Sequence, residues 1–235
     1  MKLYVNGDSH AAAAEAVNSS AFAEDESQYF YLGRAPHPDN KKVSWSRKLA
    51  DIIKAGLYLD AESASSNARI IRTTKQWLET QDNIDDVLVI IQWSTWERRE
   101  WLIGKQYFQI NASGIDDVPE SHVEKYKEFV RTVDWDVCTA RAHDDIWAFH
   151  NELNAQNIKH IFFNGNNSFN SVPNKSRKDW GASYIAPYSV SNTFDSVLRA
   201  NGFETVAPNS YHYGKESHRF WAKHMLQYIN ENKMV

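Results

Sequence analysis

The stretch Val87–Trp93, VLVIIQW, is the strongest strand signal in the sequence. It is apolar on both faces and rich in β-branched residues, which is typical of a strand at the centre of a parallel sheet covered by helices. Its carboxyl end, Gln92–Glu100 (QWSTWERRE), is abruptly polar. Because ligands gather at the carboxyl ends of strands in open α/β sheets, we expect the functional site at this edge.

Strand and helix patterns alternate on both sides of this central strand. Further strands are predicted at Leu3–Val5, Leu57–Asp60, Ile158–Phe163 and, as a weak edge, Phe203–Val206. Helices are predicted over 11–17, from Ser44 or Ser46 to Gly56, from Ser65 or Ser66 onward, and over 120–133, 139–157, 191–200 and 215–232. The alternation predicts an α/β fold, a three-layer αβα sandwich with a parallel sheet of about five strands and right-handed crossovers.

Three segments have no clear period and are predicted to be irregular: 18–42, 101–119 and 166–188. Long loops inside compact domains are usually functional or disordered. The first one follows the amino-terminal segment directly, so we expect it to form a rim or lid with Tyr29, Phe30 and Tyr31 as anchors. Since no linker or internal repeat is evident, residues 1–235 are predicted to form a single domain.

Composition excludes several classes of function. The 235 residues carry a net charge of −4 without a long basic run, which argues against binding of nucleic acid through phosphate neutralisation. No apolar run is long enough to span a membrane, and the amino terminus lacks the features of a signal peptide, so a cytoplasmic or particle-associated protein is expected. One cysteine, Cys138, allows no internal disulfide. Dinucleotide, phosphate-loop and zinc motifs do not occur, so neither a cofactor nor a metal is expected.

The first ten residues, MKLYVNGDSH, combine a short strand with a sharp turn. Gly7 turns without a Cβ clash, and Asp8 and Ser9 favour turns and helix caps. If the alanine-rich residues that follow form a helix, Ser9 lies where free backbone N–H groups point outward. A serine there can attack an acyl group while its own amide holds the oxyanion. The alternative is that Ser9 only caps a helix.

Such a serine needs a base, and His212 is the only late histidine that the pattern places in a turn. A Gly7-Asp8-Ser9 motif near the amino terminus, with a turn histidine just before the last helix, resembles the SGNH (GDSL) hydrolase superfamily. The resemblance covers most of the chain and implies a flavodoxin-like sheet, with Ser9 as nucleophile and His212 as base. Without it, His212 is most simply a turn residue bonded to backbone.

The resemblance also suggests an oxyanion hole. The segment Ala64-Ser65-Ser66-Asn67 looks like the second block of the family, with Ala64 where glycine is usual, so the amides of Ser9 and Ala64 are implied as donors. The third block, Gly-x-Asn-Asp, has no literal match. Gln92, Ser94 or Thr95, which occupy its place, would have to supply the side-chain donor.

The fifth block, Asp-x-x-His, places Asn209 where the family has the aspartate that orients the histidine. An amide can orient an imidazole, but it scarcely stabilises the charged form. Asp8 is expected to be a turn former and not a substitute for that aspartate. Arg98, at the carboxyl end of the central strand, is the candidate for contact with an anionic group of a substrate.

These features predict a serine esterase of the SGNH type, preferably acting on short acyl groups of a carbohydrate, as an O-deacetylase does. A small-molecule or carbohydrate ester is the expected partner. The alternative keeps the fold without catalysis, as a binding or structural module, because three motif positions depart from the family. Acyl transfer to a sugar would use the same residues. The sequence does not determine the oligomeric state.

Overall fold

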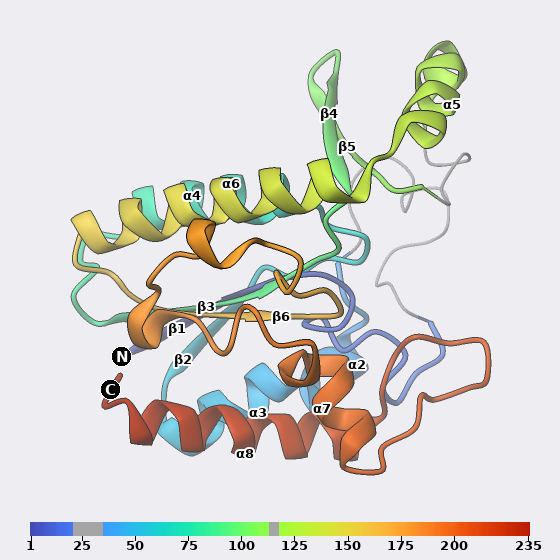
Figure 1. The fold of residues 1–235 in the computed structure, drawn as a ribbon. Helices are drawn as coiled ribbons and strands as arrows, with labels where there is room; N and C mark the ends of the chain where they lie inside the picture. Colours follow the sequence, from blue (N-terminus) through green and yellow to red (C-terminus); the bar gives the residue numbers. More distant parts are fainter. Residues whose placement is uncertain (21–34, 113–117) are drawn as a thin grey trace.

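A four-stranded parallel sheet forms the centre of the part of the protein that the computed structural model describes, residues 1–20, 35–112 and 118–235 (Figure 1). The strand order is β2-β1-β3-β6. The strands are β1 (Lys2–Asn6), β2 (Gly56–Leu59), β3 (Val87–Trp93) and β6 (Lys159–Asn164). The predicted α/β class and parallel sheet are confirmed. The sheet has four strands where about five were predicted, because the weak edge strand predicted at Phe203–Val206 contributes only an isolated bridge from Thr205 to Tyr213.

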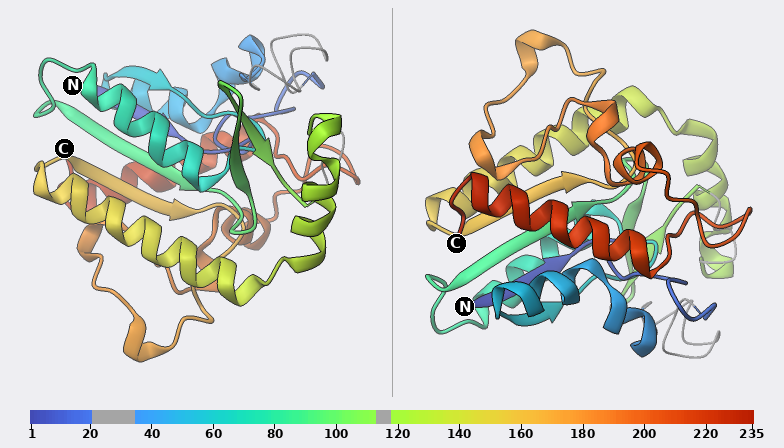
Figure 2. Two further views of the ribbon diagram at one scale, coloured as in Figure 1. Left: turned by 90° about the horizontal axis from the view of Figure 1, so that it is seen from above. Right: turned by 90° about the horizontal axis from the view of Figure 1, so that it is seen from below.

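Helices cover both faces of the sheet, which gives the predicted three layers (Figures 1 and 2). One face packs against α4 (Asn67–Glu79) and α6 (Trp135–Ala155), and the other against α3 (Trp45–Ile53), α7 (Phe194–Ala200) and α8 (Lys215–Glu231). Along β1, Leu3 and Val5 enter the core with α3 and α8, whereas Tyr4 enters the core with α4 and α6. This alternation follows from the two-residue period of a strand.

Two predicted serine caps are confirmed. Ser44 Oγ accepts a hydrogen bond of 3.2 Å from Arg47 N at the start of α3. Ser66 Oγ accepts one of 3.2 Å from Arg69 N at the start of α4. Each cap satisfies one of the backbone N–H groups that a helix leaves free at its amino end.

The predicted helix over residues 11–17 is wrong. The segment is a series of turns in which Ala13 and Glu15 have left-handed φ angles of 57° and 61°. Ala11, Ala12, Ala13 and Ala14 are all buried, so packing on every side decides the conformation here and overrides the helix propensity of alanine. Ser9 therefore precedes a compact turn and not a helix.

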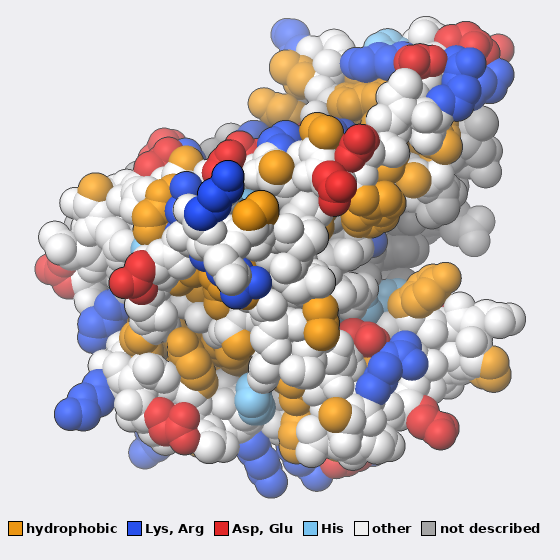
Figure 3. Space-filling model, in the orientation of Figure 1, with side chains coloured by type: hydrophobic (Ala, Val, Ile, Leu, Met, Phe, Trp, Pro, Cys, Tyr) orange, Lys and Arg blue, Asp and Glu red, His pale blue; other side chains and the backbone are white. Residues whose placement is uncertain are grey.

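A hairpin projects from the carboxyl edge of the sheet, where the sequence predicted an irregular segment (Figure 1). Strands β4 (Arg99–Ile103) and β5 (Gln106–Ile110) pair in antiparallel fashion across Gly104, whose φ of 63° suits a tight turn. The hairpin packs against α5 (Val123–Thr132) in a small separate core. In Figure 3, hydrophobic side chains gather beneath the charged end of α5.

The other long segments contain only short helical pieces among their described residues. The 18–42 segment ends in α2 (Pro38–Val43), and its predicted anchors Tyr29, Phe30 and Tyr31 lie outside the described residues. The 166–188 segment contains two short 3-10 turns, η3 (Asn174–Ser176) and η4 (Gly181–Ser183). Two further 3-10 turns, η2 (Glu120–His122) and η5 (Val190–Asn192), lie just outside these segments. The predicted loop over 166–188 is thus largely confirmed.

Part of the 166–188 loop lies along the outer edge of β6. Tyr184 forms a parallel bridge with Phe162, and Ile185 N donates a 2.9 Å hydrogen bond to Phe162 O. Tyr188 Oη holds the same loop together by accepting hydrogen bonds from Lys178 N (2.6 Å) and Trp180 Nε1 (3.0 Å).

Across the described ranges, no helix is long and apolar enough to cross a membrane.

Candidate active site

The candidate site begins at the Gly7-Asp8-Ser9 turn, which follows β1 directly. A Cβ atom at position 7 would lie 2.7 Å from Ala11 Cβ and 3.0 Å from the carbonyl oxygen of Gln92. Only glycine fits this close approach of the turn to β3 without a shift of its neighbours. The turn leaves Ser9 nearly buried, with 8 % of its surface exposed.

Asp8 fixes this turn to the end of β3. Its Oδ1 accepts a hydrogen bond of 3.0 Å from His10 N, as expected of a turn former. Its Oδ2 accepts one of 3.0 Å from Ser94 Oγ and one of 3.4 Å from Arg98 Nη1. Because Asp8 is 2 % exposed, these hydrogen bonds satisfy carboxylate oxygens that water scarcely reaches.

His212 lies in a turn just before α8 and contacts a carboxylate. Its Nδ1 is 2.7 Å from Glu15 Oε2. Ser210 Oγ donates a 2.6 Å hydrogen bond to the same Glu15 oxygen and accepts one of 2.9 Å from His212 N. Since an ionised carboxylate only accepts hydrogen bonds, Nδ1 of the neutral imidazole carries the proton and Nε2 carries the lone pair.

The Glu15 carboxyl is suited to remain ionised. Its partial burial raises its pKa, but the hydrogen bonds from Ser210 and His212 outweigh burial and lower the pKa below its ordinary value. The ionised carboxylate is the form that stabilises a positively charged imidazole.

His10 connects this pair to the serine turn. Its ring centroid lies 5.4 Å from that of His212 in an edge-to-face arrangement, so His212 lies beside the residue that follows Ser9. Burial lowers the pKa of His10 to about 4, which leaves its imidazole neutral at pH 7. Within the described ranges, the Ser9 hydroxyl forms no hydrogen bond, either to His212 or to another group.

Ala64, the candidate second oxyanion donor, lies in the loop between β2 and α4. Its φ of 59° is in the left-handed region, the conformation that glycine adopts without a Cβ penalty. In the part of the chain that the structure describes, the backbone amides of Ser9 and Ala64 donate no hydrogen bond. Both amides are therefore available for a ligand.

The predicted side-chain donors at the end of β3 are differently placed. Gln92 is fully buried beside Gly7 and Gly165. The Ser94 hydroxyl is engaged by Asp8, and Thr95 Oγ1 donates a 3.0 Å hydrogen bond to Glu97 Oε1. The structure thus offers no hydroxyl from this set as a free donor among the described residues.

Arg98 is also engaged within the protein. Besides its contact with Asp8, its Nη1 donates hydrogen bonds to Ser94 Oγ (2.8 Å) and Ser65 O (3.4 Å). Asp8 therefore compensates the charge of Arg98, and the contact of Arg98 with an anionic group of a substrate stays a prediction. Its Nε atom is buried and has no partner among the described residues.

Asn209 does not take the orienting position that the sequence predicted. It is exposed, and the contact at His212 Nδ1 is made by Glu15. Glu15 was missed because the alanine-rich segment was assigned to a helix, which would have directed its side chain differently. The available signal was the position of an acidic residue six places after Ser9, in the same buried segment.

Metal ligands are not grouped in this region. Among the residues that the structure describes, no set of three His, Cys, Asp or Glu side chains is placed to hold a metal ion. The groups that the structure places at this edge of the sheet are a serine, a histidine, a carboxylate and backbone amides.

Comparisons with known proteins add the following similarities. A family of unknown function (DUF6071) matches residues 37–151. No curated protein matches the chain. The psychrotrophic esterase EstA from Pseudoalteromonas sp. is similar over 98 % of this chain and 97 % of its own, with 11 % identity and a TM-score of 0.48. The acetyl xylan esterase Est2A from Butyrivibrio proteoclasticus is similar over 100 % of this chain and 65 % of its own, with 15 % identity and a TM-score of 0.45.

Proposed function

We propose that this protein is a serine ester hydrolase of the SGNH type, in which Ser9 is the nucleophile and His212 the base. The 2.7 Å contact between His212 Nδ1 and Glu15 carries the proposal. It fixes the tautomer in which Nε2 accepts a proton, which is the form that a general base for a serine requires.

The reaction follows from these roles. Ser9 Oγ attacks the ester carbonyl carbon while its proton moves to His212 Nε2. The amides of Ser9 and Ala64 donate to the oxyanion of the tetrahedral intermediate. When the intermediate collapses, the carbon–oxygen bond to the alcohol breaks and His212 returns the proton to the departing alcohol. Water, activated by the same histidine, then releases the acid from Ser9.

Glu15 takes the part that the fifth family block gives to aspartate. Its carboxylate orients the imidazole and stabilises the imidazolium that forms during the attack. Ser210 supports it by donating a hydrogen bond to the oxygen that contacts His212. Glu15 thus supplies the carboxylate that is missing at Asn209.

Short acyl esters of carbohydrates are the proposed substrates. The segments that follow β1 and β3 support this choice because they combine polar and aromatic side chains, Ser9 and His10 after β1 and Thr95 and Trp96 after β3. Polar groups bind the hydroxyl groups of a sugar, and aromatic rings pack against its apolar face. Transfer of the acyl group to a sugar would use the same residues.

The test is hydrolysis of a short-chain aryl acetate by the wild-type protein and by Ser9→Ala. We expect activity in the wild type and its loss in the variant. A serine-directed fluorophosphonate should label the wild type at Ser9, and His212→Ala should abolish the labelling. Equal hydrolysis by wild type and Ser9→Ala would remove Ser9 from the mechanism.

A catalytically inactive binding module is the second candidate. It is favoured by the lack of a hydrogen bond from Ser9 to His212 within the described ranges, although such bonds often tighten only when substrate is bound. This candidate predicts a protein that binds glycans but neither hydrolyses aryl acetates nor reacts with fluorophosphonates.

A further inference from the structure

We infer that Gln109, on the β4–β5 hairpin, is a positioning residue that holds Ala64 in the left-handed conformation in which its amide serves the oxyanion hole. This inference rests on the proposed function, because it assigns a role to the amide of Ala64. The contact that carries it is the 2.9 Å hydrogen bond that Ser66 N donates to Gln109 Oε1.

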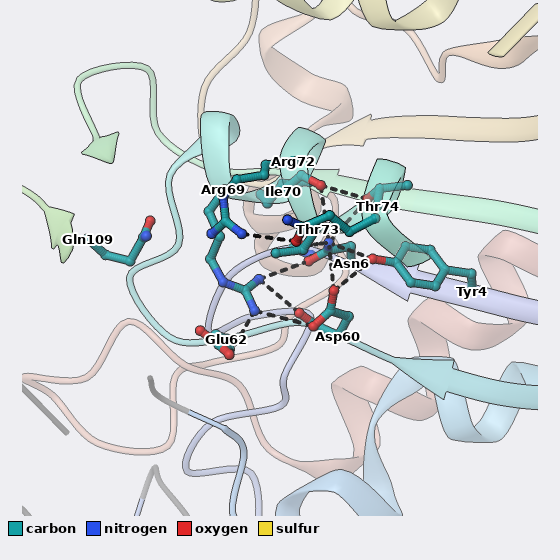
Figure 4. A network of polar contacts seen from close by, with 12 residues as sticks. Tyr4, Asn6, Asp60, Glu62, Arg69, Ile70, Arg72, Thr73, Thr74 and Gln109 are labelled. Atoms are coloured by element: carbon teal, nitrogen blue, oxygen red, sulfur yellow. Dashed lines mark hydrogen bonds and ion pairs between the residues drawn. The ribbon is translucent and has the colours of Figure 1, made fainter. Parts of the chain in front are cut away.

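The loop that contains Ala64, residues 60–66, is fastened at its beginning. Asp60 N donates to Val5 O (2.9 Å), and Glu62 N donates to Gly7 O (3.3 Å). The buried guanidinium of Arg69 lies between the two carboxylates of this segment, 3.3 Å from Asp60 Oδ1 and 2.7 Å from Glu62 Oε1 (Figure 4). These contacts fix the loop up to the residues just before Ala64.

The end of the loop is fastened by the hairpin and by Arg98. Ser65 O accepts the hydrogen bond from Arg98 Nη1, and Ser66 N donates to Gln109. Ser66 is fully buried, so its amide has no access to water in place of Gln109. Ala64 thus lies between two fixed segments of the chain.

The orientation of the Gln109 carboxamide is determined by a neighbouring carboxylate. Gln109 Nε2 donates a 2.8 Å hydrogen bond to Glu100 Oε1, which leaves Oε1 of Gln109 to accept from Ser66 N. Glu100 is itself held by two hydrogen bonds from Arg72, of 2.7 and 2.9 Å. A chain of contacts therefore runs from α4 through the hairpin to the residue after Ser65.

These contacts are needed because Ala64 is not glycine. A left-handed φ is unfavourable for a residue with a Cβ, so the surroundings must impose it. Loss of the Gln109 contact leaves the Ser66 amide unsatisfied. The turn across Ala64 then depends on the 3.3 Å hydrogen bond from Ser65 N to Glu62 O and on Arg98, and we expect it to relax toward a negative φ. The Ala64 amide then turns away from the position of the oxyanion.

The test compares Gln109→Leu with Gln106→Leu, which changes the same residue type at an exposed position of the same strand. For hydrolysis of a short-chain aryl acetate, we expect Gln109→Leu to lower kcat by about 10- to 100-fold with KM changed less than about twofold, since an oxyanion donor acts on the transition state. Gln106→Leu should keep the wild-type kcat. Gln109→Asn, which is too short to reach both partners, should behave like Gln109→Leu if the leucine variant folds poorly.

Rescue distinguishes positioning from general destabilisation. Adding Ala64→Gly to Gln109→Leu should recover at least about threefold in kcat, because glycine adopts a positive φ without the Cβ penalty. An unchanged kcat in Gln109→Leu, an equal loss in Gln106→Leu, or no recovery in the double variant would overturn the inference.

A second readout does not depend on catalysis. The backbone φ of Ala64, measured by NMR from chemical shifts and scalar couplings, should leave the left-handed region in Gln109→Leu and stay there in Gln106→Leu. If the wild type hydrolyses no ester, the proposed function fails, and this measurement still decides whether Gln109 holds Ala64. An unchanged φ in Gln109→Leu would exclude it.

Discussion

The Glu15 carboxylate lies 2.7 Å from His212 Nδ1, although 197 positions separate the two residues in the chain. The contact joins the turn after β1 to the turn before α8. Single substitutions at Glu15 and at Asn209 can therefore show which of the two residues orients the His212 imidazole.

We predict that Glu15→Gln lowers kcat for a short-chain aryl acetate by up to about 10⁴-fold, the size of the loss for the equivalent change in serine proteases. The amide keeps the shape of the side chain but does not stabilise the imidazolium. Asn209→Ala, at an exposed position, should retain wild-type kcat. A large loss in Asn209→Ala with little loss in Glu15→Gln would contradict the assignment.

Stability should decrease as the pH falls below about 6.5, because buried histidines are held neutral. His160 Nδ1 donates to Ile158 O and His150 Nδ1 donates to His160 Nε2, both at 2.8 Å. Burial lowers the pKa of His160 to about 4, so the unfolded chain binds more protons than the folded protein between pH 6.5 and 4. The stabilisation is present above pH 6.5 and is lost on acidification.

The size of this effect for His160 alone is on the order of 3 kcal/mol. Chemical denaturation between pH 8 and 4 measures it, and His160→Gln should reduce the slope below pH 6.5. His10 and His218, whose burial lowers their pKa values to about 4 and about 3, should leave part of the slope in that variant. A flat profile down to pH 4 would show that these histidines are not held neutral.

Arg98→Met should lower the free energy of unfolding by about 3 kcal/mol, because it leaves the buried Asp8 carboxylate without its cation. The double variant Asp8→Asn/Arg98→Met should be more stable than Arg98→Met, since no uncompensated charge remains. Urea denaturation of the wild type, of Asp8→Asn, of Arg98→Met and of the double variant gives the three changes in stability. Additive losses in the double variant would show that the two side chains are not coupled.

Gly7→Ala should destabilise the protein by about 1–3 kcal/mol, since its Cβ would lie 2.7 Å from Ala11 Cβ in a packed turn. The same change at Gly56 meets no atom within 4 Å and should have little effect. Because the Gly7 turn carries Ser9, its displacement should also lower the rate of fluorophosphonate labelling. Equal stability of the two variants would argue against the close approach.

The sequence predicted the layers of the fold because they follow from local periodicity. Val87–Trp93 forms β3 with the predicted bounds, and Ser44 and Ser66 cap their helices as expected. The hairpin was missed although Gly104-Lys105 separates two short runs that contain aromatic and β-branched residues, which is a hairpin signal. That signal was outweighed by the lack of a clear period over residues 101–119.

The errors at the site have a different cause. Ala13 and Glu15 adopt left-handed φ angles that their side chains disfavour, so no local propensity predicts them. These conformations are imposed by packing between distant segments. The contact of Glu15 with His212 lies in this segment, whereas Asn209 was proposed only because the family resemblance has an aspartate at its position.

The bridge between Phe162 and Tyr184 bears on how the protein behaves at high concentration. β6 lies at one end of the sheet order, and an uncovered edge strand exposes backbone groups that can pair with another molecule. Because Ile185 N already occupies Phe162 O, this part of the edge is closed to such pairing. The loop over 166–188 therefore protects the sheet against edge-to-edge aggregation at its most apolar margin, where Ile161, Phe162 and Phe163 follow one another.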